Sequence, residues 1–496
     1  MLLGACLVAV QPDALTSRPR PEDVCALVTD GGVDGELGVR LRVTCEMRLA
    51  FEQRYVDPDS ARPAFDDAVL DEAHRADDLD AFEDRTRERL AALHDGHIRI
   101  DSTIPEKQTR AWVLPLLLAP SSRGHFIATA TGDERVPLGA EIVSVDAQNV
   151  ASLVDDRARR VPSSSDGARM ARAARWALVV AFGAATKGAP LSVRFRHHGA
   201  ERTASVDRVE YASAPPLDWT AYSDVAPLLP VDVDRVKRSE DALGASLRLG
   251  TLAWGGQTYA YAQLLEFELP RSLRTKLGDL VATANAKGWP VVLDLRANGG
   301  GSLRDAYELF SLLSPGVDTP GGVRVRASPT VLAMLTGAPD PAHDSASVRE
   351  LAASQARAVE GALASGARTT DLVRIAARAK PPDAGLHQKL VVLITPSCAS
   401  TCDVFATLLR ERGRAVFVGA PTEGAANGYS YVREADLRWR DSRGLFELVI
   451  PNHTVYVLDR VEGRPVLPDV EHELDEADVD YDNLGWRTAI QVALQR

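Results

Sequence analysis

The sequence of 496 residues lacks the patterns that usually hold a metal ion or a nucleic acid. Its ten histidines and five cysteines show neither a His-x-x-x-His nor a Cys-x-x-Cys spacing, so a zinc site has no support. Basic residues are outnumbered by acidic ones, 57 to 69, and no basic run is interleaved with aromatic residues. We therefore expect no nucleic-acid partner, no metal and no organic cofactor.

Long apolar runs are also rare. Outside residues 1–10, MLLGACLVAV, no stretch approaches the roughly 20 apolar residues of a membrane span. Residues 3–6 have the Leu-small-small-Cys form of a bacterial lipoprotein cleavage site, although too few residues precede Cys6 for a signal peptide. We expect an upstream start codon, a lipid tether at Cys6, and a place in the bacterial cell envelope or periplasm. A short buried strand is the alternative.

Four cysteines remain if Cys6 carries a lipid, and an even number suits an oxidising compartment. Cys25 and Cys45 could pair within the N-terminal segment. Cys398 and Cys402 could form a second bridge if their Cα atoms lie close enough. Two free, buried thiols that pack as small hydrophobic residues are the alternative for this second pair.

A strand-like run leads into a serine at residues 390–405, LVVLITPSCASTCDVF. The apolar run breaks at Pro396, and small residues then lead into a helix-like stretch. Ser400 would therefore lie at a helix N-terminus, where free N–H groups and the helix dipole favour a developing negative charge. This position suits a nucleophile, although an ordinary N-cap serine fits it as well.

A second run that is typical of a buried strand precedes three glycines at residues 291–301, VVLDLRANGGG. Consecutive glycines let the backbone approach a substrate closely and direct N–H groups into a site, as an oxyanion hole requires. Asp294 and Arg296 in this segment are expected to pair locally and to serve structure.

These two segments, followed by GRAVFVG at 413–419, Thr422 and EGRPVLPD at 462–469, resemble the C-terminal processing and tricorn-type serine peptidases. The likeness covers roughly residues 80–475 and includes four motifs in order. It implies a multi-domain α/β protein with a mixed α/β, crotonase-like ββα peptidase core, which acts on a peptide or protein substrate.

One branch of that family uses a Ser-Lys dyad, but this chain has Ala425 where the lysine is expected. The tricorn-like branch takes its base from a histidine near the start of the fold, and the matching stretch is LAALHDGHIRI at 90–100. The resemblance to that branch then implies a set of site residues. They are Ser400 as nucleophile, His97 as base, Glu462 as orienting acid, and the N–H groups of Gly299, Gly300 and Thr401 as oxyanion donors.

The chain departs from the tricorn-like pattern at Gly96, where that pattern has a serine that bridges the histidine to the glutamate. Either Glu462 contacts His97 directly or through water, or the triad is weaker. Without the resemblance, His97 would be read as a helix-end residue and Glu462 as a solvated one. His94 is the rival base. Asp403 is expected to be a first-turn residue that the helix dipole favours, with a group that shapes the site as the alternative.

Length and a hydrophobic content of 45% suggest about three domains with real cores. We expect a truncated signal or tether at 1–20 and a helical domain at 21–110. A β-rich domain at 111–212 resembles the PDZ-like module of the same peptidases, with a plain β-sandwich spacer as the alternative. The peptidase domain would span 213–496, with a helical insertion at about 317–386 that we expect to cap the cleft.

The predicted function is that of a serine endopeptidase. His97 would accept the Ser400 proton as the hydroxyl attacks a peptide carbonyl, and water would resolve the acyl-enzyme. A catalytically inactive family member that binds peptides or other ligands is the alternative, because the lysine is missing and Gly96 departs from the pattern. An esterase is less favoured, since the sequence has no Gly-x-Ser-x-Gly elbow.

Overall fold

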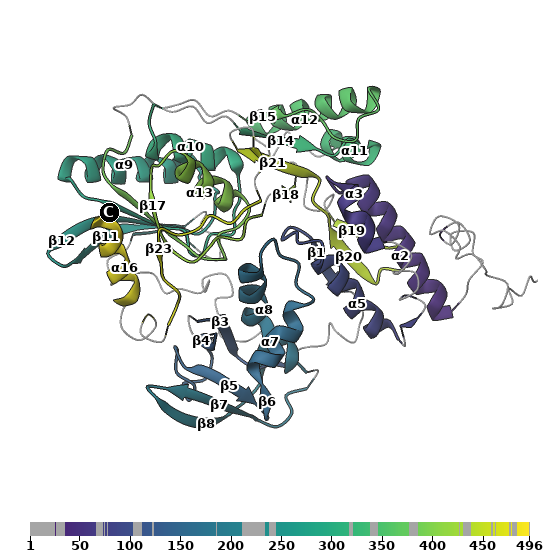
Figure 1. Ribbon diagram of the computed structural model, residues 1–496, viewed down its shortest axis with the longest axis horizontal. Coiled ribbons are helices and arrows are strands. Elements are labelled where there is room, and N and C mark those ends of the chain that lie inside the picture. Colours follow the sequence, from purple (N-terminus) through teal and green to yellow (C-terminus); the bar gives the residue numbers. More distant parts are fainter. Residues whose placement is uncertain are drawn as a thin grey trace, which may run out of the picture.

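The computed structural model describes most of the chain. The described residues are 25, 35–65, 73, 75–76, 78–102, 112–121, 124–184, 186–210, 234–237, 245–316, 321–337, 346–375, 385–425, 427–429, 438–457, 460–461, 463–475, 478 and 484–495. The expected multi-domain mixed α/β fold is confirmed by the arrangement of its helices and sheets (Figure 1).

A seven-stranded sheet organises the largest part of the molecule. Its strands, in spatial order, are β10 (Asp234–Lys237), β11 (Ala245–Trp254), β12 (Gln257–Leu264), β13 (Val291–Asp294), β16 (Leu390–Ile394), β17 (Val416–Gly419) and β23 (Val470–Glu471). The first three pair antiparallel, and the sheet continues parallel from β12 to β23. Every residue of β13 and β16 is buried, as expected for parallel strands covered on both faces.

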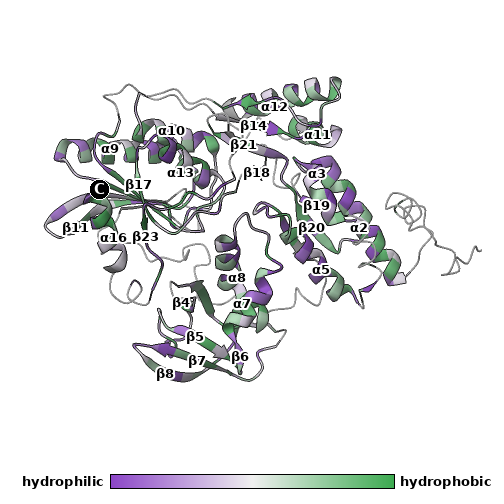
Figure 2. Ribbon diagram, in the orientation of Figure 1, coloured by the Kyte–Doolittle hydropathy of each residue, from purple (hydrophilic) through white to green (hydrophobic). Residues whose placement is uncertain are grey.

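Helices cover both faces of this sheet. One face packs against α9 (Arg271–Lys287), α10 (Leu303–Leu313) and α13 (Thr401–Glu411). The other face packs against α16 (Leu484–Gln495), whose Trp486 is 1% exposed among side chains of β12, β13 and β16. The green strands between helices with purple outer sides in Figure 2 show this layering.

The insertion expected at 317–386 contributes two strands and two helices, and the strands belong to a smaller sheet. Its strands are β15 (Val373–Arg374), β14 (Gly321–Val325), β21 (His453–Val457) and β18 (Asn427–Gly428), with β22 (Arg460–Val461) paired to β21. Helices α11 (Pro329–Gly337) and α12 (Ala346–Ala364) lie beside it and near the N-terminal helices (Figure 1).

The N-terminal segment packs on strands that come from far along the chain. It comprises α2 (Gly35–Arg54), α3 (Pro58–Ala61), the 3-10 turn η2 (Arg62–Phe65) and α5 (Leu79–Ala91). Strand β1 (Arg99–Ser102) pairs with β20 (Phe446–Val449), which also pairs with β19 (Arg438–Arg440). Phe446, Leu448 and Ile450 share one core with α2 and α5, so the N-terminal helices fold together with residues 446–450.

A separate core lies in the region between residues 112 and 210. Its strands are β3 (Leu116–Pro120), β4 (Phe126–Thr131), β5 (Glu141–Val145), β7 (Leu191–His197) and β8 (Ala200–Val206), with β6 (Gln148–Asn149) beside β5, while β2 (Trp112–Val113) pairs with β9 (Val209–Glu210). Helices α7 (Val150–Ala158) and α8 (Asp166–Ala181) lie on the side of this sheet that faces the rest of the chain (Figure 1).

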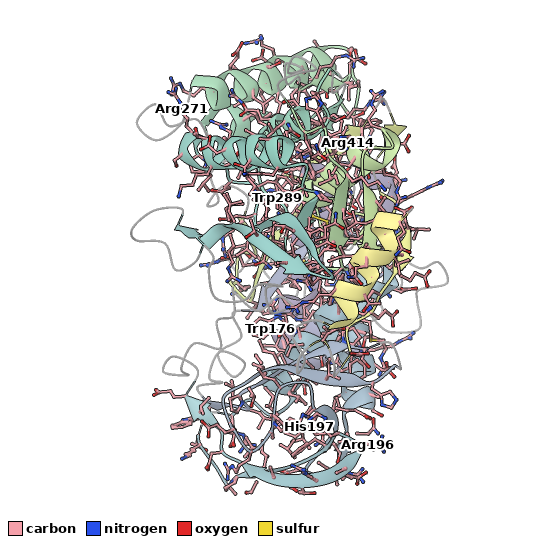
Figure 3. The ribbon with its side chains drawn as sticks, turned by 90° about the vertical axis from the view of Figure 1, so that its left-hand side faces the viewer. Trp176, Arg196, His197, Arg271, Trp289 and Arg414 are labelled. Atoms are coloured by element: carbon pink, nitrogen blue, oxygen red, sulfur yellow. A yellow bond between two sulfur atoms is a disulfide. The ribbon has the colours of Figure 1, made fainter. Side chains whose placement is uncertain are left out.

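We call the sheet β3–β8 with α7 and α8 the six-stranded unit. We call the seven-stranded sheet, with the helices that cover it and the loops that connect its strands, the large domain. Figure 3 shows Trp176 of α8 between this unit's sheet and the large domain, whereas Arg196 and His197 of β7 lie toward the far end of the molecule. Arg271, the first residue of α9, and Trp289, which follows that helix, lie in the opposite half. The unit therefore meets the large domain through its helices.

Both cysteine pairs form disulfides. Cys25 and Cys45 are bridged with Cα atoms 5.5 Å apart, and Cys398 and Cys402 with Cα atoms 5.2 Å apart. Among the described residues, no helix is long and apolar enough to cross a membrane. The lipid-tether position at Cys6 and the segment 1–20 lie outside the described residues.

We expect Trp486→Ala to destabilise the protein by about 3–5 kcal/mol, because a large buried ring would leave a cavity. The ring also lies 4.5 Å from the guanidinium of the buried Arg296, a contact that alanine cannot make. Denaturant unfolding followed by circular dichroism measures the change. Val492→Ala, on the exposed side of the same helix, is the control and should cost less than about 0.5 kcal/mol. Equal losses in the two variants would contradict the packing assigned to α16.

Candidate active site

Ser400 lies at the turn between β16 and α13, as the sequence predicts. It is the N-cap of α13, with φ 58° and ψ −124°, and its side chain makes no capping hydrogen bond. A positive φ is unusual for a residue other than glycine and persists only where the surroundings impose it. The hydroxyl is therefore held at a helix N-terminus without being used as a cap.

Several contacts impose this turn. The Cys398–Cys402 disulfide brackets Ser400, and both cysteines are fully buried. The N–H of Ala399 donates to the carbonyl of Asn298 at 3.3 Å, and the Thr401 hydroxyl donates to the carbonyl of Gly301 at 2.6 Å. The nucleophile turn and the glycine segment therefore form one unit.

Gly300 has to be glycine at this contact. Its φ is +113°, and a Cβ there would lie 2.8 Å from the Cβ of Ser400 and 3.1 Å from the N of Thr401. The Gly300 N–H donates to the Asn298 side-chain oxygen at 2.9 Å. That N–H is thus engaged within the loop, whereas Gly299 lines the cleft beside Ser400.

His97 lies in the loop after α5 and is 8% exposed. Its backbone N–H donates to Asp95 Oδ1 at 2.9 Å, and its carbonyl accepts the hydroxyl of Tyr429, whose ring meets the imidazole edge-on at 5.5 Å. Burial, with the charges of Arg172 and Arg99, lowers the pKa of His97 to about 3. The imidazole is therefore neutral at physiological pH, the form that can accept a proton.

One cleft of about 870 Å³ contains the predicted nucleophile and the predicted base. Ser400, Ala399, Gly299 and His97 all line it. No hydrogen bond joins the Ser400 and His97 side chains in the described part of the chain. Catalytic hydrogen bonds are often long before substrate binds, so a shared cleft is the relevant geometric result.

The walls of the cleft come from α5, the loop at 96–100, α7, α8 and the segment at 160–162. Among its described lining residues, none belongs to the insertion at 317–386, so the described part of this insertion does not cap the cleft. Helices α11 and α12 pack near α2 instead, and the six-stranded unit provides the cover. The rival base His94 does not line this cleft, and Arg169 Nη2 lies 2.8 Å from its ring.

Two predictions about nearby residues have different outcomes. Glu462 lies outside the described residues, so its role stays a prediction. Asp294 and Arg296 form a fully buried ion pair at 2.7 Å under the sheet edge, as the structural interpretation requires.

Asp403 stands in the first turn of α13, as expected, but its carboxylate also accepts the N–H groups of Gly424 and Ala425, each at 3.0 Å. Burial raises the pKa of Asp403 to about 8. Asp403 therefore fixes the loop that contains Ala425.

Glu423 is a site residue that sequence analysis missed. It is 1% exposed and lines the cleft next to Gly96. Its carboxylate pairs with Arg172 of α8 and accepts a hydrogen bond from the Ser163 hydroxyl at 3.3 Å. Burial raises the pKa of Glu423, while the charge of Arg172 opposes that shift.

The Glu423 carboxylate also explains the departure at Gly96. A Cβ at residue 96 would lie 1.8 Å from Glu423 Oε1, so the space that a serine side chain would need is filled by this carboxylate. Gly96 is the one signal in the sequence that could have indicated a different group here.

The six-stranded unit holds the loop of His97 through Gly96. The Gly96 N–H donates to the Ser164 hydroxyl at 3.1 Å, and its carbonyl accepts from Arg172 Nη1 at 3.0 Å. Behind the loop, Asp95 is buried and accepts hydrogen bonds from the Tyr55 hydroxyl at 2.9 Å and the Asn427 amide at 2.7 Å. Asp95 Oδ1 lies 3.9 Å from His97 Nδ1.

We expect Gly96→Ser to lower the free energy of unfolding by about 1–3 kcal/mol, because the new side chain overlaps the Glu423 carboxylate. Urea unfolding monitored by tryptophan fluorescence measures this loss. The control is Gly278→Ala, at a helical glycine with open space around a new Cβ, which should be neutral or stabilising. A Gly96→Ser variant as stable as the parent protein would disprove the overlap.

Comparisons with known proteins agree with this architecture. Residues 258–439 match the model of peptidase family S41. The solved structure of mature CPAF complexed with lactacystin superposes with a TM-score of 0.66 at 14% identity, over 92% of this chain and 98% of that chain. Mature CPAF superposes with a TM-score of 0.65 at 14% identity, over 92% and 96% of the two chains.

A search of curated proteins found no match. At 14% identity the two superpositions show a shared fold, and the family model covers the glycine segment and the serine turn described above. On these findings residues 258–439 are similar to peptidase family S41, and the chain shares the fold of mature CPAF.

Proposed function

We propose that the protein is a serine endopeptidase in which Ser400 is the nucleophile and His97 the general base. The observation that carries this proposal is that one cleft holds an uncapped serine hydroxyl at a helix N-terminus and a buried, neutral histidine. The similarity of residues 258–439 to peptidase family S41 supports a peptide or protein substrate.

The reaction proceeds by acyl transfer. His97 accepts the hydroxyl proton as Ser400 Oγ bonds to the peptide carbonyl carbon, and it then gives that proton to the leaving amine. Water attacks the resulting ester with His97 again as base, which releases the acid and restores the serine. The described residues supply these steps without a cofactor.

The oxyanion is best served by the N–H groups of Gly299 and Thr401. Gly300 completes the proposed set by allowing the close approach of the two segments, since its own N–H is bound to Asn298. The Thr401 N–H is in the first turn of α13, where the helix dipole adds to the effect.

Orientation of His97 is assigned to two carboxylates. Glu462 is the proposed partner on the family resemblance. Asp95 is the carboxylate that the described residues place beside His97, with Oδ1 3.9 Å from Nδ1, and its hydrogen bond to the His97 N–H fixes the loop. Asp95 therefore acts as a positioning residue.

A catalytically inactive, peptide-binding protein is the second candidate. The observations that favour it are the missing hydrogen bond between the Ser400 and His97 side chains in the described chain and the absence of a lysine at Ala425. Such a protein would use the same cleft for binding.

The domain and location assignments are proposals as well. We propose a helical domain at 21–110, a PDZ-like peptide-binding domain at 111–212 and the peptidase domain at 213–496; one sheet with two helices supports the second of these. An envelope or periplasmic location, with a tether at Cys6, is supported by two disulfides, which persist in oxidising compartments.

Labelling with a fluorophosphonate probe tests the proposed function. The parent protein should label at one site, which peptide mass spectrometry should identify as Ser400, and both Ser400→Ala and His97→Ala should abolish labelling. Tyr307→Phe, at a buried position of α10 that is not among the described residues lining the cleft, serves as a folded control that labels normally. Folded parent protein that never labels or cleaves protein substrates would favour the binding candidate.

We expect labelling to persist at acidic pH. The pKa of His97 is lowered from its ordinary value of 6.5 to about 3, so the base stays neutral well below pH 6.5. The labelling rate should change less than about twofold between pH 8 and pH 5, and fall as the pH approaches that lowered pKa. The measurement is the pseudo-first-order rate constant of labelling at each pH.

Folding has to be verified at each pH of that series. The pKa of His453 is also lowered to about 3, and the unfolded chain therefore binds protons to both histidines before the folded chain does. Their contribution to stability is complete above pH 6.5 and is lost as the pH falls below that value. A labelling midpoint near pH 6.5 in protein that is still folded would contradict the buried, neutral state of His97.

A further inference from the structure

Charged side chains line much of the cleft that contains Ser400. Five arginines and four carboxylates take part, namely Arg87, Arg99, Arg157, Arg160, Arg172, Glu83, Asp84, Asp156 and Glu423. An excess of one positive charge in this cleft contrasts with the net charge of −12 for the whole chain. An arginine of the cleft with no carboxylate beside it would determine which ligands the cleft attracts.

Most of these arginines are already paired. Arg87 contacts Glu83 at 2.7 Å, and Arg172 contacts the buried carboxylate of Glu423. Arg160 lies 3.1 Å from Asp156 and 3.4 Å from Asp84. Arg157 also interacts with a neighbour. The charges of Arg87, Arg160 and Arg172 are therefore largely neutralised by carboxylates of the cleft wall.

Arg99 differs from the others. Its side chain is exposed, and no carboxylate of the described chain lies within 4 Å of its guanidinium. A cation on a cleft wall without a partner is available to a ligand. Guanidinium groups bind carboxylates through two parallel hydrogen bonds, so a carboxylate is the ligand of choice.

Arg99 is also close to the reacting groups. It is two residues from His97, so their Cα atoms are at most about 7 Å apart. Its charge acts on both the His97 imidazole and the Tyr429 hydroxyl. A peptide whose carbonyl lies at Ser400 and His97 would pass Arg99 within one or two residues of the reacting bond.

The strand that carries Arg99 borders the cleft at a sheet edge. In the three-stranded sheet, β1 is the outer strand, paired with β20 on one side. The cleft lies against its first residues, Arg99 and Ile100. An extended peptide can therefore lie alongside β1 with one side chain directed at Arg99.

We propose that Arg99 selects peptide substrates with an aspartate or glutamate side chain within two residues of the cleaved bond. This inference rests on the proposed peptidase function for cleavage, but the binding preference does not require chemistry. The carboxylate of the substrate neutralises the excess charge of the cleft, and lysine or arginine at the same position is repelled.

Cleavage specificity is measured first. A library of C-terminally amidated peptides, which present no terminal carboxylate, is digested and the products are identified by mass spectrometry. The parent protein should prefer Asp or Glu at one position near the cut. For a Glu peptide, Arg99→Gln should lower kcat/KM about tenfold, mainly through KM, and leave the Gln twin of that peptide nearly unchanged.

Two further variants sharpen the result. Arg99→Glu should shift the preference toward Lys at the same position, and Arg160→Gln, at a cleft arginine that is already paired, should keep the acidic preference. The preference of the parent protein should weaken as salt is raised from 0.05 to 0.5 M. Equal losses on Glu and Gln peptides in Arg99→Gln would show that Arg99 only supports the fold, and would overturn the proposal.

Binding separates this proposal from the proposed function. Fluorescence anisotropy with Ser400→Ala measures the affinity for fluorescein-labelled amidated peptides in which one Glu is moved through eight positions, each with its Gln twin. Tighter binding of one Glu peptide, lost in Ser400→Ala/Arg99→Gln, supports the role of Arg99 even if the parent protein never labels. Equal binding of every Glu and Gln pair, with or without Arg99, would reject it.

Discussion

The contact between Glu423, Arg172 and Gly96 is the constraint on which the site depends. Glu423 belongs to the large domain, and its N–H donates to the carbonyl of Cys398 at the nucleophile turn. Its carboxylate pairs with Arg172 in the six-stranded unit, and Arg172 in turn holds the carbonyl of Gly96. The six-stranded unit therefore connects the turn of Ser400 to the loop of His97, and both residues line one cleft. Glu423 is buried while Arg172 is partly exposed, and the pair holds the nucleophile turn and the loop of His97 in one arrangement.

Burial determines the chemical state of the groups around this contact. It keeps the His97 imidazole neutral and raises the pKa values of Asp403 and Glu423. Hydrogen bonds from these buried groups hold loops in place. The Asp403 carboxylate, for example, accepts two backbone N–H groups of the loop at 424–425. One side of the cleft thus has a low-dielectric interior, while Arg99 leaves an exposed charge at its rim.

The sequence predicted the parts of the fold that follow from local patterns. Apolar runs at 291–293 and 390–394 indicated buried strands, and the structure confirms both. The serine at the end of one strand and the glycines at the end of the other could be expected to meet, because neighbouring parallel strands end at one edge of a sheet. The disulfide around Ser400 remained one of two alternatives, since spacing alone does not give the distance between Cα atoms.

The sequence by itself determined the mixed α/β core, the helix N-terminus at Ser400 and the glycine segment beside it, because these depend on residues close together in the chain. The tertiary structure alone decided that the six-stranded unit, and not the described part of the insertion at 317–386, lines the cleft. It also decided that Glu423 fills the space at Gly96 and that Arg99 stays without an acidic partner in the described chain. The contact between residues 96 and 423 joins positions hundreds of residues apart. It depends on how distant parts of the chain pack together, and a local pattern of hydrophobic or turn residues contains no information about that packing.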